Sequence, residues 1–516
     1  MARLRRAAVL AFLFLALAEA SLTQGTGWNQ GAHYALVRAL SRGSPIIDRD
    51  RGKTGDVSWF HGHYYSNKAP GLAFVLLPEY EVLRYGGLEH ALGRLPGVSN
   101  STVGSSWALG LLGCILPGLL ALLLVQRLGD VLADGYGTAA AVTIGLGTIL
   151  LPFSTLLYAH LLSASLGFAG FALLWLEHER RGVLRPLVAA SAGALAGFAI
   201  TTEYPLALVA VVTGVYLLAR SRSVRAGALY ASGVSAGLLP LAFYNRWAFG
   251  SFSHLSYVDA VSRGGRSGHD LLKANTKGFF GLGRPSFSTA AELLFSKIGL
   301  VTLTPIVVLG VVGALLLFRR GRAPEGLAIC ALVLAYLLYN SGYYDPWGGP
   351  APGPRFMIPI FLLLGPPLAL LYRLAPLTTL ALGLPSILLM AAVTATGPMQ
   401  ADDGLWLQRI TGGTFAGRGT LVVVPFVLLV AAAVVAAARA TGRLQVNLVD
   451  TIRAGVSLIG WLLLALLPHR VLEQQQWSGT TRGMVEVALL ASVVLAAASI
   501  GMLDLGRHPA PSTDPS

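Results

Sequence analysis

The densest group of side chains able to do chemistry lies in residues 47–71. It holds Asp48, then Thr54-Gly55-Asp56, then the run Gly-His-Tyr-Tyr-Ser-Asn-Lys-Ala-Pro-Gly at 62–71. A carboxylate can take a proton from an attacking hydroxyl, and an ammonium can meet a phosphate as a point charge. Tyrosine rings can stack on flat or amphipathic ligands. This stretch predicts acid–base chemistry on a phosphate-bearing ligand; the alternative is an interfacial loop anchored by aromatic residues.

Within this stretch, two carboxylates are candidates for a general base. Asp56 is preferred, because Asp48 is followed by Arg49 with Arg51 close by, so that an ion pair is its simpler explanation. Both remain candidates. The side chains expected to contact the substrate here are His63, Tyr64, Tyr65 and Lys68.

A second group comprises residues 343–349, Tyr-Tyr-Asp-Pro-Trp-Gly-Gly, and residues 353–356, Gly-Pro-Arg-Phe. Arg355 can fork onto a phosphate or pyrophosphate. The glycines allow backbone to approach a ligand closely, and Trp347 is a further binding candidate. The alternative is an aromatic belt with an arginine that reaches up to the interface.

Isolated polar residues give weaker signals. Glu203 lies between two close apolar blocks, where an acid is functional by default unless the turn leaves it in water. His160 fits a structural polar contact, and Asp402-Asp403 a solvated surface. Lys273, Lys277 and Arg284 either steer an anionic ligand or face lipid headgroups.

The elements that position these groups are membrane helices. The chain is 54% hydrophobic and only 12% charged, whereas soluble domains carry about 25% charged residues. Apolar blocks long enough to cross a bilayer, about 20 residues each, recur along it. We therefore predict an all-α polytopic transmembrane helical bundle of about 12–14 spans, at about 7–22, 105–126, 137–158, 161–176, 186–202, 204–219, 226–243, 299–318, 325–340, 357–373, 375–395, 420–438, 452–467 and 484–503.

The net charge of +14 is explained by topology rather than by nucleic acid, because no basic stripe interleaves with aromatic residues. With both termini in the cytoplasm, the short arginine clusters all fall on the cytoplasmic side, as the positive-inside rule requires. They include Arg127, Arg180, Arg181, Arg185, Arg220, Arg222, Arg225, Arg319, Arg320, Arg322, Arg373, Arg439, Arg443 and Arg453. The opposite face receives the long segments 23–104, 244–298, 341–356, 396–419 and 468–483.

The first of these segments, about 23–104, is the richest in polar and aromatic residues. Within it, 33–40 and 70–83 are predicted to be interfacial helices, since each is amphipathic or too short to span. We expect a catalytic region at 1–400, further membrane helices at 401–505 and a disordered tail at 506–516. The signal-like start is interpreted as an uncleaved first span, with cleavage as the alternative.

Several kinds of site have no sequence support. Cys114 and Cys330 lie in apolar blocks and suggest neither disulfides nor a cysteine metal site. The sequence contains no Walker loop, dinucleotide fingerprint or H-E-x-x-H motif. ATP-driven transport and a Rossmann-bound nucleotide sugar are therefore not indicated; no cofactor or metal site is expected, although a divalent metal is left open.

The first-loop motifs resemble the membrane glycosyltransferases of the GT-C class, in particular bacterial relatives of protein mannosyltransferases and of the aminoarabinose transferase (glycosyltransferase family 39-like). The matching residues are Gly55-Asp56, Gly62-His63-Tyr64-Tyr65 and Lys68-Ala69-Pro70, with Trp347-Gly348-Gly349 and Gly353-Pro354-Arg355 downstream. The likeness covers roughly residues 1–400.

This resemblance implies inverting transfer of a sugar from a polyprenyl-phosphate carrier to a glycan, lipid or protein acceptor, outside the cytoplasm of a bacterial cell. Lys68 and Arg355 would hold the phosphate, and Asp56 or Asp48 would act as base. The sequence departs from the family pattern twice: Asn29-Gln30 replaces an acidic pair, and Tyr158-Ala159-His160 replaces an acid. A transporter or flippase of lipid-linked glycans, and a non-catalytic scaffold, are the alternatives.

Overall fold

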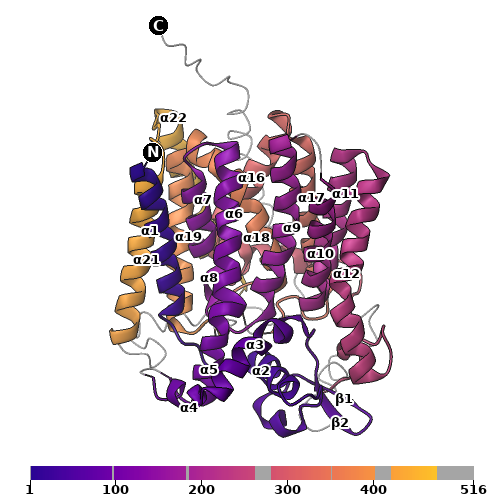
Figure 1. Ribbon diagram of the computed structural model, residues 1–516. Coiled ribbons are helices and arrows are strands. Elements are labelled where there is room, and N and C mark those ends of the chain that lie inside the picture. Colours follow the sequence, from indigo (N-terminus) through magenta and orange to yellow (C-terminus); the bar gives the residue numbers. More distant parts are fainter. Residues whose placement is uncertain are drawn as a thin grey trace.

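The computed structural model describes residues 2–95, 98–181, 185–261, 281–349, 351–400 and 420–472. The longer helices run roughly parallel and form a bundle (Figure 1). Its helices are α1 (Ala2–Ala20), α5 (Ser101–Gly110), α6 (Leu116–Leu132), α7 (Gly137–Gly147), α8 (Leu150–Ser154), α9 (Ala159–Arg181), α10 (Pro186–Thr202), α11 (Ala207–Ser221), α12 (Val224–Phe249), α14 (Phe287–Phe295), α15 (Leu300–Leu303), α16 (Ile306–Arg319), α17 (Ala323–Gly342), α18 (Ile358–Leu374), α19 (Pro376–Thr396), α21 (Thr420–Ala440) and α22 (Leu448–Leu472).

Within the described ranges, nine helices are long and apolar enough to cross a membrane, or ten if one bent pair counts as a single span. Two apolar helices, α7 and α10, are shorter. The protein is thus a mostly helical, multi-pass membrane protein. The expected span at 484–503, the segments 401–419 and 473–505 and the tail at 506–516 lie outside the described residues.

Two expected spans are broken rather than continuous. The predicted span 137–158 divides into α7 and α8, and the predicted span 299–318 divides into α15 and α16. The helical segment Phe287–Leu303, which ends with α15, is bent by 91° relative to α16. Hydroxyl groups bond the backbone at these breaks: Thr148 Oγ1 donates to the Ile144 carbonyl, and Ser386 Oγ accepts from the Ile306 N–H at 3.1 Å. Serine and threonine can satisfy freed backbone groups within a membrane, which periodicity alone does not reveal.

Close packing of α10 against α12 follows from glycines spaced four apart on both helices. A Cβ at Gly193 or Gly197 would collide with backbone carbonyls of α12, and one at Gly233 or Gly237 would collide with those of α10. Small residues at this spacing let membrane helices approach closely. The pair fixes the end of α10, from which Glu203 projects.

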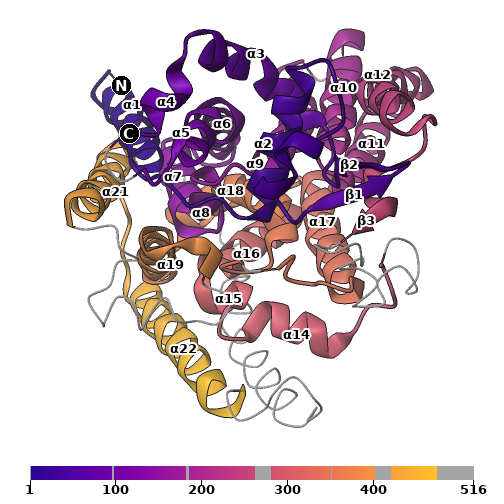
Figure 2. The same ribbon diagram turned by 90° about the horizontal axis from the view of Figure 1, so that it is seen from below.

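A layer of small elements covers one end of the bundle. It contains α2 (Trp28–Leu40), a 3₁₀ helix (Asp48–Lys53), β1 (Val57–Phe60), β2 (His63–Ser66), α3 (Gly71–Tyr85), α4 (Leu88–Leu92) and β3 (Ala260–Val261). Seen from below, α2 and α3 lie across the ends of the membrane helices, with the strands at one side (Figure 2). The segments 33–40 and 70–83, expected to be interfacial helices, are therefore helical and lie within α2 and α3.

The small antiparallel sheet, in the order β2-β1-β3, was not anticipated. Its tight turn is formed by His61 and Gly62, both with positive φ, 48° and 88°. Positive φ at both central residues is the geometry of the most favourable two-residue hairpin turn. Because a non-glycine residue occupies the first of these positions, the sequence signal for a hairpin is weak here.

The opposite end of the bundle carries the arginine-rich connections (Figure 1). Arg322 pairs there with Glu179, and Arg185 pairs with Glu177. Arg220 lies 3.3 Å from the buried carboxylate of Glu325. These predicted topology signals thus also tie neighbouring helices together.

Candidate functional site

The segment leading into β1 places the carboxylate of Asp56 against the ammonium of Lys68, at 2.9 Å. Thr54 Oγ1 donates to the Trp28 carbonyl at 2.6 Å and accepts from the Asp56 N–H at 2.9 Å, which ties Asp56 to the start of α2. Gly55 lies against the Trp28 ring so closely that a Cβ there would overlap it. In the Thr-Gly-Asp motif, the Thr54 hydroxyl and the close contact of Gly55 with Trp28 therefore fix the backbone that carries Asp56.

Lys68 is brought to the bundle by the start of α3. A Cβ at Gly71 would lie 2.5 Å from Thr202 Oγ1 and 2.7 Å from its Cα, so α3 packs directly on the last turn of α10. Glu203 follows Thr202. The Lys-Ala-Pro-Gly motif thereby brings Lys68 of the loop layer toward Glu203 at the end of α10.

Glu203 is paired with a histidine from a third helix. His160, at the start of α9, places its Nδ1 3.1 Å from Oε1 of Glu203. Its Nε2 is buried and has no hydrogen-bond partner among the described residues. The glutamate at this depth is therefore part of a polar cluster and not a solvated turn.

His33, on the first turns of α2, lies in the same cluster. Its side chain is fully buried, and neither ring nitrogen has a hydrogen-bond partner in the part of the chain that is described. Burial lowers the pKa of His33 to about 3, with smaller electrostatic contributions from Glu203, Lys68, His160 and Asp56. An imidazole in this position is neutral at physiological pH.

Arg355 enters from the segment before α18. Its guanidinium carbon lies 5.4 Å from the centre of the Tyr158 ring, and the ring of Phe356 packs edge-on to His160 at 5.6 Å. Gly348, at φ 79°, lies beneath the guanidinium, where a Cβ would collide with Nε of Arg355. Arg355 also acts electrostatically on Asp56, so the two predicted groups of residues come within electrostatic range although they are about 300 positions apart.

The charges of this cluster act on Asp56. Burial raises the pKa of its carboxyl, but the positive charges of Lys68 and Arg355 outweigh burial and hold the pKa below its usual value. Asp56 is therefore ionised at neutral pH and can accept a proton. The cluster combines two cations, two carboxylates and two imidazoles at one end of the bundle.

Other predicted site residues lie elsewhere. Asp48 accepts from the Tyr64 N–H at 2.7 Å and contacts Nδ1 of His63 at 2.8 Å, and both side chains are largely exposed. Tyr64 pairs with Trp59 in the sheet. Trp59 is three residues after Asp56, which is about 10 Å along an extended strand, so Asp48 contacts the hairpin well away from Asp56.

The two remaining aromatic candidates are packed into the protein. The ring of Tyr65 packs on Phe249, 5.0 Å between centroids. Trp347 is nearly buried, and its Nε1 has no partner among the described residues. Their predicted substrate contacts stay predictions.

Sequence reasoning did not select His33 as a site residue, and it gave His160 a structural role. The available signal was the position of the two histidines in the sequence. His33 lies close to Asn29-Gln30 and His160 lies in Tyr158-Ala159-His160, the two places where the sequence departs from the pattern of the family that it resembles. Lys273 and Lys277, expected to steer an anionic ligand, and Asp402-Asp403 lie outside the described residues. No group of three or more metal-ligating side chains is found in the ranges that the structure describes.

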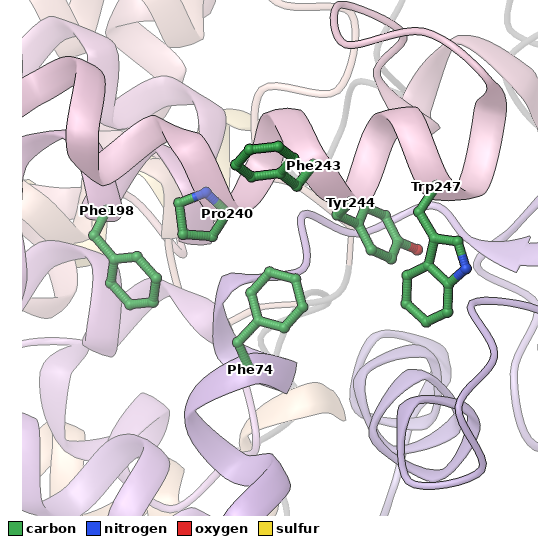
Figure 3. A pocket seen from close by; sticks show the side chains of 6 residues that line it. All are labelled: Phe74, Phe198, Pro240, Phe243, Tyr244 and Trp247. Carbon is green, nitrogen blue, oxygen red and sulfur yellow. The ribbon is translucent and has the colours of Figure 1, made fainter.

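An apolar groove lies between α3, α10 and α12. It has a volume of about 430 Å³ and is lined by Phe74, Phe198, Pro240, Phe243, Tyr244 and Trp247 (Figure 3). Phe74 belongs to α3, shortly after Lys68, and Phe198 belongs to the last turns of α10, shortly before Glu203. The other four lining residues belong to α12, so the groove lies between α12 and the two helices that position Lys68 and Glu203.

Three solved membrane proteins have a similar fold. ArnT from Cupriavidus metallidurans, bound to undecaprenyl phosphate, aligns with a TM-score of 0.47 and 14% identity over 98% of this chain and 76% of that chain. The arabinosyltransferase EmbB from Mycobacterium smegmatis aligns with a TM-score of 0.43 and 14% identity over 97% of this chain and 41% of that chain. The oligosaccharyltransferase from Archaeoglobus fulgidus aligns with a TM-score of 0.42 and 13% identity over 92% of this chain and 60% of that chain. These GT-C glycosyltransferases resemble the chain in fold over nearly its whole length.

No protein-family model matches the sequence, and no curated protein matches it.

Proposed function

We propose that this protein is a glycosyltransferase that moves a sugar from a polyprenyl-phosphate carrier to an acceptor at the extracytoplasmic face of a bacterial membrane. The observation that carries the proposal is the convergence of Asp56, Lys68 and Arg355 where the loop layer meets the bundle. Two cations beside an ionised carboxylate suit a reaction in which a phosphate leaves and a hydroxyl loses its proton. The arginine clusters at the other end support the orientation.

In the proposed reaction, the acceptor hydroxyl oxygen attacks the anomeric carbon while the bond from that carbon to the phosphate oxygen breaks. The hydroxyl proton passes to the Asp56 carboxylate. The bonding electrons stay on the carrier phosphate, whose added negative charge is met by Lys68 and Arg355. Attack opposite the leaving phosphate inverts the anomeric centre.

The ion pair between Lys68 and Asp56 suggests an order of events. When the carrier phosphate binds Lys68, it competes with Asp56 for the ammonium, and the carboxylate becomes available to the acceptor. Binding of the donor therefore prepares the base. The aromatic groove fits the isoprenoid chain of the same lipid, because it is apolar and is lined in part by α3 and α10, the helices next to Lys68 and Glu203.

A transporter or flippase of lipid-linked glycans fits less well. Transporters place their polar sites near the bilayer midplane, at broken helices. The two breaks described above are bonded by hydroxyl groups of the protein itself. The charged cluster lies instead at one end of the bundle, beneath the loop layer.

The proposal is tested with purified protein in lipid nanodiscs and a panel of polyprenyl-phosphate sugars, incubated with envelope extract as the acceptor source. We expect at least one sugar to be transferred with release of free polyprenyl phosphate. If every lipid crosses the bilayer of a reconstituted vesicle intact and none is cleaved, the protein is a flippase instead.

A further inference from the structure

Three buried imidazole nitrogens remain unsatisfied in the polar cluster. They are both ring nitrogens of His33 and Nε2 of His160, none of which has a hydrogen-bond partner in the described chain. Buried polar groups in proteins are nearly always hydrogen-bonded, and each exception requires an explanation. Such groups, held together beside a catalytic centre, are explained by a ligand that supplies the missing partners.

The protonation pattern of the pair defines the chemistry of that ligand. In the neutral form of His160, Nδ1–H donates to the Glu203 carboxylate and Nε2 keeps a lone pair that requires a donor. A neutral His33 offers one N–H donor and one lone-pair acceptor. A hydroxyl group both donates and accepts, so a ligand that carries hydroxyl groups complements this arrangement.

The position of His33 and His160 indicates which molecule supplies the hydroxyl groups. His33 is within electrostatic range of Lys68 and Asp56, the two groups that flank the reacting atoms in the proposed reaction. The donor sugar is bonded directly to the phosphate that Lys68 holds, so its ring must lie beside Lys68. On the basis of the proposed function, we infer that His33 and His160 form a subsite for the hydroxyl groups of the donor sugar.

Glu203 is the positioning residue of this subsite. It holds His160 through Nδ1 and does not need to touch the sugar itself. The close contact of Gly71 with Thr202 sets its distance from Lys68. The groups left to contact the sugar are imidazoles rather than carboxylates. The subsite therefore suits an uncharged, hydroxyl-bearing sugar.

The test compares two lipids on the same protein: a polyprenyl-phosphate hexose and bare polyprenyl phosphate. His33→Leu and His160→Leu should each weaken binding of the sugar-bearing lipid by about tenfold or more and leave binding of the bare lipid unchanged. His160→Gln should recover part of the loss. His90→Leu makes the same chemical change at an exposed histidine of α4 and should alter neither lipid.

The bare lipid also separates this inference from the proposed function. Wild-type protein that binds neither lipid would refute the proposed function and the subsite with it. Equal loss of both lipids in the leucine variants would show a structural role and overturn the subsite. Unchanged binding of both, or a change only in the KM for the acceptor, would also overturn it.

Discussion

The ammonium of Lys68 lies 2.9 Å from the Asp56 carboxylate, so the cation proposed to hold the phosphate and the base proposed to take the proton neutralise each other. Each is only partly buried. A phosphate arriving at Lys68 replaces one anion by another, so the ammonium is paired at both stages while the Asp56 carboxylate is released. This exchange couples donor binding to activation of the acceptor.

Arg355 is expected to hold the donor phosphate by its fork of N–H groups. Arg355→Ala should weaken donor binding by about tenfold or more, which is about 1.4 kcal/mol. Arg355→Lys should weaken it less, because the charge is retained and only the bidentate geometry is lost. Binding is measured with labelled donor in nanodiscs. Equal affinity in all three proteins would remove Arg355 from the site.

The close packing of α3 on α10 is expected to be intolerant of a single methyl group. Gly71→Ala places a Cβ against the backbone of Thr202 and should cost about 1–3 kcal/mol of stability. Its thermal midpoint in detergent should fall, together with activity. Gly52→Ala is the matched control, because no atom lies within 4 Å of its added Cβ. Equal midpoints for the two variants would contradict the packing.

Acid should destabilise the protein through His33. Its pKa of about 3 in the folded protein lies below the ordinary 6.5, so between these values the unfolded chain binds a proton that the folded chain does not. Stability therefore falls as the pH is lowered from about 6.5 toward 3. The fall in thermal midpoint from pH 7.5 to pH 5 should be smaller in His33→Gln. An identical fall would show that His33 does not contribute to it.

The orientation is tested with single cysteines in a protein whose Cys114 and Cys330 are replaced by alanine. Arg49→Cys and Ser251→Cys are exposed near the loop layer, and Arg225→Cys is exposed at the other end. An impermeant thiol reagent should label the first two in intact cells and the third only after lysis. The reverse pattern would invert the proposed orientation.

Much of this arrangement is predictable from sequence because it depends on local signals. Apolar block length gives the spans, and one-sided arginines place residues 343–356 at the same end as the first loop. The pairing of Asp56 with Lys68 is not predictable in this way, because it follows from the β1–β2 hairpin, whose register pairs Val57 with Ser66 and whose turn has a weak sequence signal. His33 was missed for a similar reason: a histidine on an amphipathic helix gives no local sign of its tertiary neighbours.

The choice between the two carboxylates is the clearest example of what the structure adds. In the sequence, Asp48 and Asp56 are eight positions apart, and Asp56 is preferred because arginines accompany Asp48. In the structure, Asp48 bonds the exposed hairpin through Tyr64, while Asp56 lies among Lys68, Arg355 and His33. The geometry of the hairpin separates the two carboxylates, and this separation cannot be predicted from composition or from the spacing of the residues.

The central claim is that Asp56 takes the acceptor proton, and it is tested most directly by measuring turnover and donor affinity in Asp56→Asn and Asp48→Asn side by side. Turnover by Asp56→Asn should fall by about 10²–10⁴-fold. Its donor affinity should be retained or increased, since Lys68 loses its competing carboxylate. Asp48→Asn should turn over at close to the wild-type rate. Near-normal turnover in Asp56→Asn would contradict the account, and a selective loss in Asp48→Asn would transfer the role to that residue.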